Sequence, residues 1–321
     1  MFRNCSLLEK LNINNIITEH ITDFSGLFYD CVSLTSLDLS NFNTMRAKSL
    51  SSMFTNCKKL STLNIESFNT TYVTTFYGMF QSCLSLKSLK LSNFNTDNAN
   101  SFSNMFYYCS SLTSLNIKNF NTNKLKEMKS MFEGCSCIKE LDLNNFNTIT
   151  IPSFAHLFSG CSNLTSVSLS SWKTNSLTDM SYMFFQCSSL KFLDLSNFNT
   201  SNVINFDSIF MGCELLDNLD LSNFQTNKVQ YMYRMFENCI SLTSINLSTF
   251  KTDSLVVMDE MFKSCKNLKS LDLTSFDTSK CYSFRQAFDG CNDLVIYLIA
   301  SKNNILIYNL PNYVRYIDVE S

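Results

Sequence analysis

The sequence contains little of what most catalytic sites are built from. Histidine occurs only as His20 and His156, and the 321 residues include six glycines and two prolines. The patterns G-x-x-x-x-G-K, G-x-S-x-G and H-E-x-x-H are absent, so no phosphate-binding loop, nucleophile elbow or zinc-protease helix is indicated. Because histidine is the most frequent general acid or base, and both histidines fall at variable positions, we predict a protein that is not an enzyme and needs no cofactor.

The chain also lacks an excess of either charge and a long apolar run. Its 25 Lys and Arg residues are balanced by 27 Asp and Glu residues, whereas a nucleic-acid-binding surface normally shows in the totals. No apolar stretch approaches the roughly 18 to 20 residues that cross a bilayer, and no secretory signal is recognisable. The composition therefore predicts neither nucleic-acid binding nor a transmembrane segment.

What the chain does have is a strict repeat of 26 residues. Twelve cysteines, here called the ladder cysteines, follow this spacing without insertion or deletion: Cys5, Cys31, Cys57, Cys83, Cys109, Cys135, Cys161, Cys187, Cys213, Cys239, Cys265 and Cys291. A phenylalanine stands three residues before each of them, and aliphatic residues stand three, six and eight residues after most of them. A second aromatic column follows eleven residues after the cysteine, and a threonine column follows thirteen residues after it. A period of this length indicates a solenoid, in which each repeat buries its apolar face against its neighbours.

One repeat is enough to predict the structure of a coil. Residues Leu190–Leu195 read L-x-x-L-x-L, which is typical of a short strand with one buried face. Residues Asn197–Asn202 suit a turn, and the apolar residues between Val203 and Cys213 have the spacing of a short amphipathic helix. We therefore predict an α/β fold, a right-handed solenoid of about twelve coils with a parallel β-sheet on one side and short helices on the other.

The repeat also sets the expected domain boundaries. Residues 1–293 should form the solenoid and residues 294–321 a β-rich C-terminal cap, in which Leu294 and Ile299 keep their columns while Ile305–Tyr308 and Tyr313–Val319 form strands. Met1 falls on the repeat's own methionine column, so we expect the N-terminal cap to be missing. An uncapped first coil predicts end-to-end self-association.

The ladder cysteines are expected to be buried thiols. Identical positions in every coil point side by side, which favours neither disulfides nor a metal site, since metal ligands must converge on one point. The sequence thus predicts no bound metal. Only Cys137 and Cys281 lie off the ladder, and these two are the thiols to test for reactivity.

The outward side chains of the predicted strands form the candidate binding surface. They stand five, seven and nine residues after each ladder cysteine, and we call them the strand-face ribbon. The ribbon is mostly Ser in its first and third columns and Asp or Asn in its second, and Phe192 interrupts the first column between Ser166 and Asn218. It is either a solvated sheet face or a surface for an extended protein or glycan ligand. The candidate ligand-binding residues are Phe192, Asp194, Asp220, Asn218, Asp142 and Ser166.

The repeat unit closely resembles a known family. Its sequence L-x-x-L-D-L-S-N-F-N-T-x-x-V-x-x-M-x-x-M-F-x-x-C-x-S is similar to the BspA-like leucine-rich repeat, described as a Mycoplasma-type surface protein repeat, and residues 28–291 match it throughout. The resemblance implies surface-exposed or secreted proteins associated with adhesion, with no catalytic residues. In this chain an aromatic residue such as Phe198 replaces the asparagine that usually follows the strand, so we expect no asparagine ladder at that position.

Three functions stay open on this reasoning. The first is an adhesin-like interaction module, located at the cell surface or outside the cell, that binds a protein or glycan. The second is a structural stalk or spacer array with no selected ligand. The third is an ice- or crystal-surface binder that uses the threonine column from Thr18 to Thr278.

Overall fold

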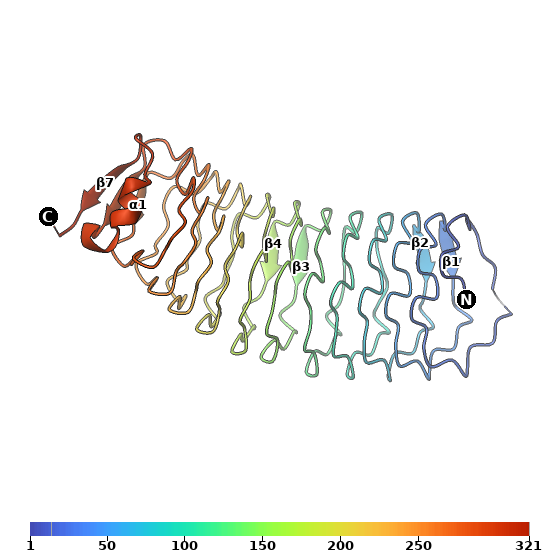
Figure 1. The fold of residues 1–321 in the computed structure, drawn as a ribbon. Helices are drawn as coiled ribbons and strands as arrows, with labels where there is room; N and C mark the ends of the chain where they lie inside the picture. The colour runs from blue at the N-terminus through green and yellow to red at the C-terminus, as the bar shows by residue number, and fades with distance from the viewer. Residues whose placement is uncertain (14, 321) are drawn as a thin grey trace. The chain divides into compact units, whose positions relative to one another are not determined.

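The computed structural model describes residues 1–13 and 15–320, so Ser321, the last residue of the expected cap, lies outside the described residues. The contacts divide the chain into two compact units. Unit 1 contains Met1–Ile151 and Gly160–Ser171, and unit 2 contains Pro152–Ser159 and Trp172–Ser321. Within each unit the chain winds through successive coils that stack on one another (Figure 1). Each unit is described by itself below.

Parallel strands stack on one side of unit 1, as the repeat predicts. Strand β1 (Ser36–Asp38) pairs with β2 (Thr62–Asn64), and β3 (Glu140–Asp142) pairs with β4 (Ser166–Ser168). Partner residues are 26 positions apart, as in Leu37 opposite Leu63, so the sequence repeat is also the strand register. The pleat buries Leu37 and exposes Ser36 and Asp38 on either side of it.

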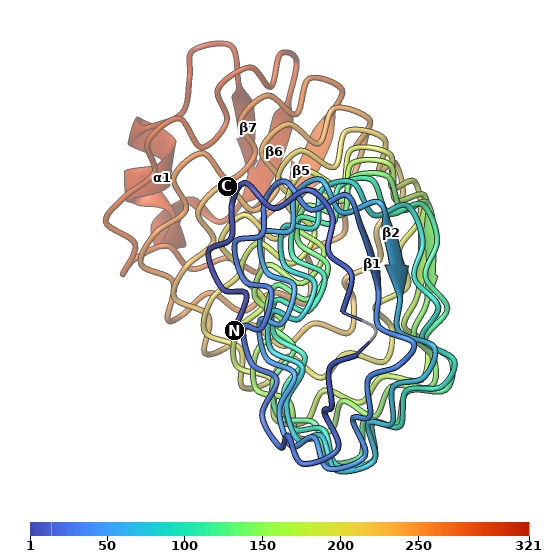
Figure 2. The same ribbon diagram turned by 90° about the vertical axis from the view of Figure 1, so that its right-hand side faces the viewer.

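Unit 2 contains a three-stranded parallel sheet in the order β5–β6–β7 (Figure 2). Its strands are β5 (Ser270–Asp272), β6 (Val295–Leu298) and β7 (Arg315–Asp318). Leu271 pairs with Ile296, a separation of 25 residues, so β6 is one residue out of the repeat. A shift of one residue exchanges the two faces of a strand. Leu298 is therefore fully buried, and the predicted core position of Ile299 is wrong.

The segment between β6 and β7 is helical and not extended. It contains the 3₁₀ helix η1 (Ala300–Lys302) and the helix α1 (Asn304–Tyr308). The strand predicted over Ile305–Tyr308 is wrong, because the Ile307 N–H donates to the Asn303 carbonyl at 3.0 Å and one turn of helix carries Leu306 into the interior. The strand predicted within Tyr313–Val319 is present as β7.

The helices predicted for each coil are also wrong. Among the described residues the helical elements are η1 and α1, and within the predicted helix residues 207–212 instead form consecutive turns. Alternate N–H groups close these turns, as in Cys213 to the Phe210 carbonyl at 3.0 Å. The N–H groups between them cross to the next coil, with donor–acceptor pairs Phe206–Tyr231, Ser208–Tyr233, Phe210–Met235 and Gly212–Glu237.

The cause is backbone conformation. In each coil the residues five and one before the ladder cysteine have positive φ, as in Ser208 at 53° and Gly212 at 74°. A left-handed residue breaks the α-helical ladder. Its own N–H donates to the neighbouring coil, as in Ser208 to the Tyr233 carbonyl and Gly212 to the Glu237 carbonyl. Parallel bridges on this turn side then join the coils of each unit, as in Thr75 with Ser101 and in Asn205 with Tyr231.

The core of each unit includes three ladders of like residues. Phenylalanines stack ring on ring, from Phe2 to Phe132 in unit 1 and from Phe158 to Phe288 in unit 2, with centroids 5.4 to 5.8 Å and 5.3 to 6.1 Å apart respectively. Each ladder thiol from Cys31 onward donates to a phenylalanine carbonyl of the preceding coil, as in Cys109 to Phe80 at 3.1 Å. Each stack therefore combines apolar burial with hydrogen bonds that link its coils.

The threonine column forms the third ladder and is buried. The Thr96 hydroxyl donates to the Asn121 carbonyl at 3.0 Å and accepts from the Asn121 N–H at 2.7 Å. The same two hydrogen bonds join Thr226 to Lys251. Thr18 to Thr278 are at most 3% exposed. The predicted ice-binding surface is therefore wrong, because its hydroxyls are engaged inside the coils.

Candidate functional site

The strand-face ribbon is exposed in both units, and its second column has a local structural task. The carboxylate of Asp38 accepts the Ser40 N–H at 2.9 Å, and Asp194 and Asp220 accept the N–H groups of Ser196 and Ser222 at 3.0 and 2.9 Å. Each of these side chains closes a turn at the end of its own strand. Asparagines at this position do the same, as in Asn246 with Ser248 at 3.0 Å.

These bonds also decide the electrostatics of the ribbon. Donation from the Ser196 hydroxyl and N–H lowers the pKa of Asp194, and donation from the Ser222 N–H and hydroxyl lowers the pKa of Asp220. Both carboxylates are thus stabilised as anions by their own strand ends. In the described part of the chain no group of three or more His, Cys, Asp or Glu side chains is arranged to hold a metal ion.

Four of the predicted site residues gather in unit 2. Phe192 forms a parallel bridge with Asn218, and the Phe192 side chain is 65% exposed. Asp194 and Asp220 follow two positions later in the same two coils and are exposed as well. An aromatic ring therefore stands in water among small polar groups, with two anions beside it.

The other two predicted residues lie in unit 1. Asp142 ends β3, where it accepts the Asn144 N–H at 3.3 Å and pairs with the Lys118 ammonium at 3.2 Å. Ser166 begins β4 and lies opposite Glu140 in the β3–β4 register. These two belong to the same polar ribbon, which in unit 1 has no exposed aromatic residue in its first column.

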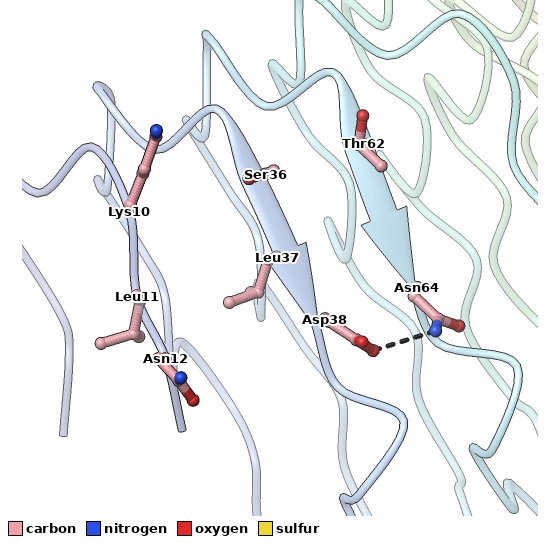
Figure 3. Close-up of a pocket in the computed structure, with 8 residues that line it drawn as sticks. All are labelled: Lys10, Leu11, Asn12, Ser36, Leu37, Asp38, Thr62 and Asn64. Atoms are coloured by element: carbon pink, nitrogen blue, oxygen red, sulfur yellow. Dashed lines mark hydrogen bonds between the residues drawn. The ribbon is translucent and has the colours of Figure 1, made fainter. Parts of the chain in front are cut away.

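Sequence reasoning missed two open hollows on the ribbon of unit 1. The first lies over β1 and β2, where the Asn64 amide donates to Asp38 at 2.9 Å (Figure 3). It is lined by Lys10, Leu11, Asn12, Ser36, Leu37, Asp38, Thr62 and Asn64. The second is lined by Ser88, Leu89, Thr113, Ser114, Leu115, Asn116, Lys139 and Glu140. The signal in the sequence was the change of size along the first column, from Lys10 to Ser36 and from Ser114 to Glu140.

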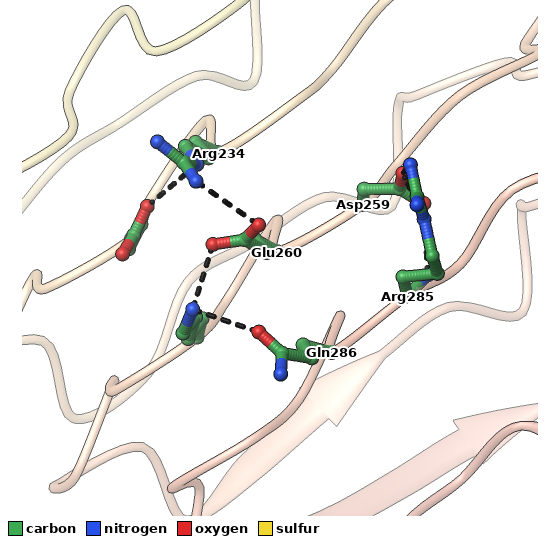
Figure 4. A network of polar contacts seen from close by, with 7 residues as sticks. Arg234, Asp259, Glu260, Arg285 and Gln286 are labelled. Carbon is green, nitrogen blue, oxygen red and sulfur yellow. Dashed lines mark hydrogen bonds and ion pairs between the residues drawn. The ribbon is translucent and has the colours of Figure 1, made fainter.

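A network of charges on the turn side of unit 2 was also missed (Figure 4). Arg234 contacts Glu237 at 3.2 Å and Glu260 at 3.1 Å, and the Lys263 ammonium lies 2.8 Å from both Glu260 and Gln286. Burial raises the pKa of Glu237, whereas for Glu260 the same effect is outweighed by bonds from Lys263 and Arg234, so its pKa is lowered. The network fastens three successive coils.

The thiols and histidines give no catalytic arrangement. All the cysteines are free, and burial raises the pKa of Cys109, Cys161 and Cys213 to about 12. Cys281 is buried too, with its pKa raised to about 11, which leaves Cys137 as the half-buried thiol off the ladder. A thiol with a raised pKa is a poor nucleophile and metal ligand at neutral pH.

His20 is exposed and lies 3.2 Å from Glu19, while His156 is half-buried and stacks on Tyr182 with ring centroids 4.6 Å apart. Neither histidine belongs to the ribbon. Across the described residues, no helix combines the length and apolar character that a membrane crossing requires.

Comparison with known proteins places the chain in a family. A family model described as "Mycoplasma protein of unknown function, DUF285" matches residues 1–114, 78–191, 136–247 and 216–299. The chain belongs to this family. The BspA-like, Mycoplasma-type resemblance of the repeat is thereby confirmed. No curated protein matches the sequence.

Solved structures with similar chains include several leucine-rich-repeat proteins. A leucine-rich cell surface protein from Faecalibacterium prausnitzii A2-165 is 17% identical, with a TM-score of 0.41 and coverage of 92% of this chain and 83% of that one. TLR13, in a complex with ssRNA13, is 18% identical with a TM-score of 0.36, and the match covers 93% of this chain and 52% of TLR13. The leucine-rich-repeat domain of APL1B is 15% identical with a TM-score of 0.32, covering 99% and 91%.

Proposed function

We propose that the chain is a non-enzymatic interaction domain, an adhesin-like surface repeat that binds an extended protein or glycan along the strand-face ribbon. The observation that carries the proposal is the exposure of Phe192 on a strand face otherwise made of small polar and acidic side chains. Exposed aromatic residues framed by polar groups are the usual anchors of interfaces. The location at the cell surface or outside the cell is proposed from the family resemblance alone.

The geometry of the ribbon suits a ligand that is itself extended. Its outward side chains repeat from coil to coil at the strand spacing of about 4.8 Å. Phe192 and Asn218 then offer an apolar contact next to an amide, with Asp194 and Asp220 as acceptors beside them. We further propose that residues 1–293 present this surface, with Asp142 and Ser166 in its unit 1 part, and that residues 294–321 cover the last coil.

A structural spacer is the second candidate function. It is favoured by the turn-closing role of the ribbon carboxylates, since Asp38, Asp194 and Asp220 are explained without any ligand. Under this alternative Phe192 has no partner. Self-association through the first coil stays a prediction, which sedimentation of the purified chain would test.

The test is a binding screen that compares the native chain with a variant of Phe192 and a control variant. The purified chain is measured against immobilised matrix proteins and glycans, beside Phe192→Ser and Tyr282→Ser. Serine is the usual residue of the Phe192 column, so this variant should fold normally, and Tyr282 is an equally exposed ring of unit 2 that lies off the ribbon (75% exposed).

We expect Phe192→Ser to lower the affinity for the ligand found in the screen by about tenfold or more, as for an interface anchor. Tyr282→Ser should leave this affinity unchanged. A ligand that binds both variants as tightly as the native chain would refute the role of Phe192. A screen with no ligand at all would favour the spacer.

A further inference from the structure

A second surface of unit 1 contains a hollow lined by basic, polar and aromatic side chains. An open hollow of about 790 Å³ is lined by Thr22, Arg46, Lys48, Tyr72, Thr74 and Asn98. These residues stand fifteen or seventeen positions after their ladder cysteines, on a different part of the coil from the ribbon. The hollow therefore uses none of the residues of the function proposed above.

The backbone under this hollow is held by bonds between coils. The Lys48 N–H donates to the Thr22 carbonyl at 2.7 Å, and the Thr74 N–H donates to the Lys48 carbonyl at 2.9 Å. The same link continues from Asn100 to Thr74 at 2.8 Å and from Lys126 to Asn100 at 2.9 Å. The side chains at these positions are thus presented on a pre-formed ladder, which reduces the ordering cost of binding.

The cations in the hollow are not neutralised by neighbouring carboxylates. Arg46 and Lys48 are both exposed, and in the described part of the chain neither of them forms an ion pair. Glu19 lines an adjoining hollow together with Arg46 and lies 3.2 Å from His20, and Asp97 accepts the side-chain amides of Asn95 and Asn121. An anion in the hollow would meet two positive charges that form no ion pair within the described residues.

Uncharged hydrogen-bonding groups and one ring separate these cations from a second pair. Tyr72 is 60% exposed, and Thr74 and Asn98 follow it along the edge. Lys124 then donates to the Asn98 amide oxygen at 2.7 Å, with Lys126 two positions further on. Because three coils separate the two pairs of cations, they stand roughly 14 Å apart. We call Arg46, Lys48, Tyr72, Lys124 and Lys126 the basic edge.

We propose that the basic edge binds a linear anionic polysaccharide. Carboxylate or sulfate groups of the chain would pair with Arg46 and Lys48, a sugar ring would lie on Tyr72, and hydroxyls would bond to Thr22, Thr74 and Asn98. The mixture of hydroxyl, amide and ring between the charges is what favours a sugar polymer over an acidic peptide, which offers backbone groups and few hydroxyls. Two cationic pairs in line also suit a ligand whose charges repeat.

The experiment is calorimetric titration of the purified chain at 50 and 300 mM NaCl. The probes are heparin as a sulfated polymer, hyaluronan as a carboxylated polymer, dextran as a neutral polymer and poly-L-glutamate as an acidic peptide. The variants are Arg46→Gln/Lys48→Gln and Tyr72→Ser. The control is Lys228→Gln/Lys280→Gln, which removes two positive charges from unit 2, both from the column fifteen residues after the ladder cysteine that Arg46 also occupies.

We expect saturable binding of heparin or hyaluronan, weaker at the higher salt concentration because exposed charges are screened. The double variant should lose about tenfold or more in affinity and Tyr72→Ser about threefold, the loss typical of one removed contact. The control should stay within about twofold of the native chain, and dextran should not bind. Phe192→Ser should bind the polyanion normally, so failure of the ribbon and failure of the basic edge give different results.

Three results would overturn the proposal. One is the absence of saturable binding to both polyanions. Another is an equal loss in the unit 2 control, which would reduce the effect to overall charge. The third is equal Arg46-dependent binding of poly-L-glutamate, which would make the ligand an acidic peptide. Thermal unfolding of each variant checks that the coils are intact.

Discussion

The position seventeen residues after the ladder cysteine differs between the two units. In unit 1 it is polar or basic, with Thr22, Lys48, Thr74, Asn100 and Lys126, and in unit 2 it is largely apolar, with Pro152, Thr178, Ile204, Gln230, Val256 and Tyr282. The ladder cysteine itself and the phenylalanine before it do not vary between the units. These interior columns stay apolar in both units because they are stacked, and the change from polar or basic to apolar side chains lies at a position that the stack does not use.

The turn side shows the opposite trend. The left-handed position five residues before the ladder cysteine is small in unit 1, with Gly26, Ser52, Gly78, Asn104 and Ser130. In unit 2 the same position is His156, Tyr182, Ser208, Arg234, Glu260 and Gln286. A bulky residue with positive φ is strained, and in unit 2 the ion pairs of Arg234 and Glu260 offset part of that strain. At this left-handed position, charged side chains therefore occur in unit 2 and not in unit 1.

If the interiors of the two units are equivalent, truncation of a stacked ring should lower the free energy of unfolding by the same amount in both. Phe132 and Phe210 are fully buried members of the two phenylalanine stacks. We expect Phe132→Ala and Phe210→Ala each to lower the free energy of unfolding by about 3 to 5 kcal/mol, through lost burial and a cavity.

Native-state hydrogen exchange measures this loss locally, because long repeat arrays depart from two-state unfolding. Phe192→Ala, which removes an exposed ring, should change the stability by less than about 0.5 kcal/mol. If the losses of unfolding free energy in Phe132→Ala and Phe210→Ala differ by more than about 2 kcal/mol, the two interiors are not equivalent.

The threonine ladder tests the same equivalence with a smaller effect. Thr96→Val in unit 1 and Thr226→Val in unit 2 keep the shape of the side chain but leave the N–H and carbonyl of the next coil without a partner. We expect a loss of about 1 to 3 kcal/mol for each, from unsatisfied buried groups. Thr96→Ser keeps the hydroxyl and should lose clearly less, and urea denaturation compares the three. If Thr96→Val lost no more stability than Thr96→Ser, the hydrogen bonds of the hydroxyl would contribute nothing to stability.

The smallest predicted effect is the change in unfolding temperature when a carboxylate is replaced by an amide, and it should have opposite signs in the two units. Burial raises the pKa of Asp207 in unit 2, so its contribution to stability is present below the ordinary carboxyl pKa and is lost as pH rises through the raised value. Asp207→Asn cannot ionise and its amide oxygen can still accept the Tyr233 N–H, so it should unfold at a higher temperature than the native chain at pH 7.

Asp38 of unit 1 should behave in the reverse way. The Ser40 N–H and hydroxyl lower the pKa of Asp38, so its contribution is present above the ordinary carboxyl pKa and is lost as pH falls through the lowered value. Asp38→Asn should therefore unfold at a slightly lower temperature at pH 7. Asp207→Asn should converge on the native chain near pH 3, where Asp207 is protonated in both states, and the difference between Asp38→Asn and the native chain should shrink as pH falls through the lowered pKa of Asp38. Melting curves at pH 7 and pH 3 check this, and a shift of the same sign in both variants would disprove it.

Much of the fold was predictable because every coil repeats the same buried columns. Leu37 inside and Asp38 outside follow from alternation on a strand, and the parallel 26-residue register follows from the period. The exposure of Phe192 was predictable for the same reason. An asparagine ladder was predicted to be absent from the aromatic position, and the structure places one at the preceding position, where Asn93 donates to the carbonyls of Ile65, Glu66 and Phe68.

The second half of the coil was not predictable from the pattern. Phe206, Ile209, Phe210 and Cys213 are fully buried, as an amphipathic helix would bury them. Consecutive turns bury the same four residues, so hydrophobic spacing does not distinguish the two structures. The basic edge was not predictable either, because Arg46, Lys48 and Tyr72 lie in columns that vary from coil to coil and meet only when two neighbouring coils are stacked.

The sequence by itself determined which side chains lie inside, since a strict period forces like residues onto one another and only apolar or mutually bonded ones can be stacked in that way. Tertiary structure alone decided how the backbone bonds are shared. The N–H groups of Phe206 and Phe210 find acceptors in the next coil, and those acceptors do not exist in an isolated repeat. The hydrophobic spacing alone fits a helix there, and the neighbouring coil, by offering its carbonyl groups, stabilises turns instead.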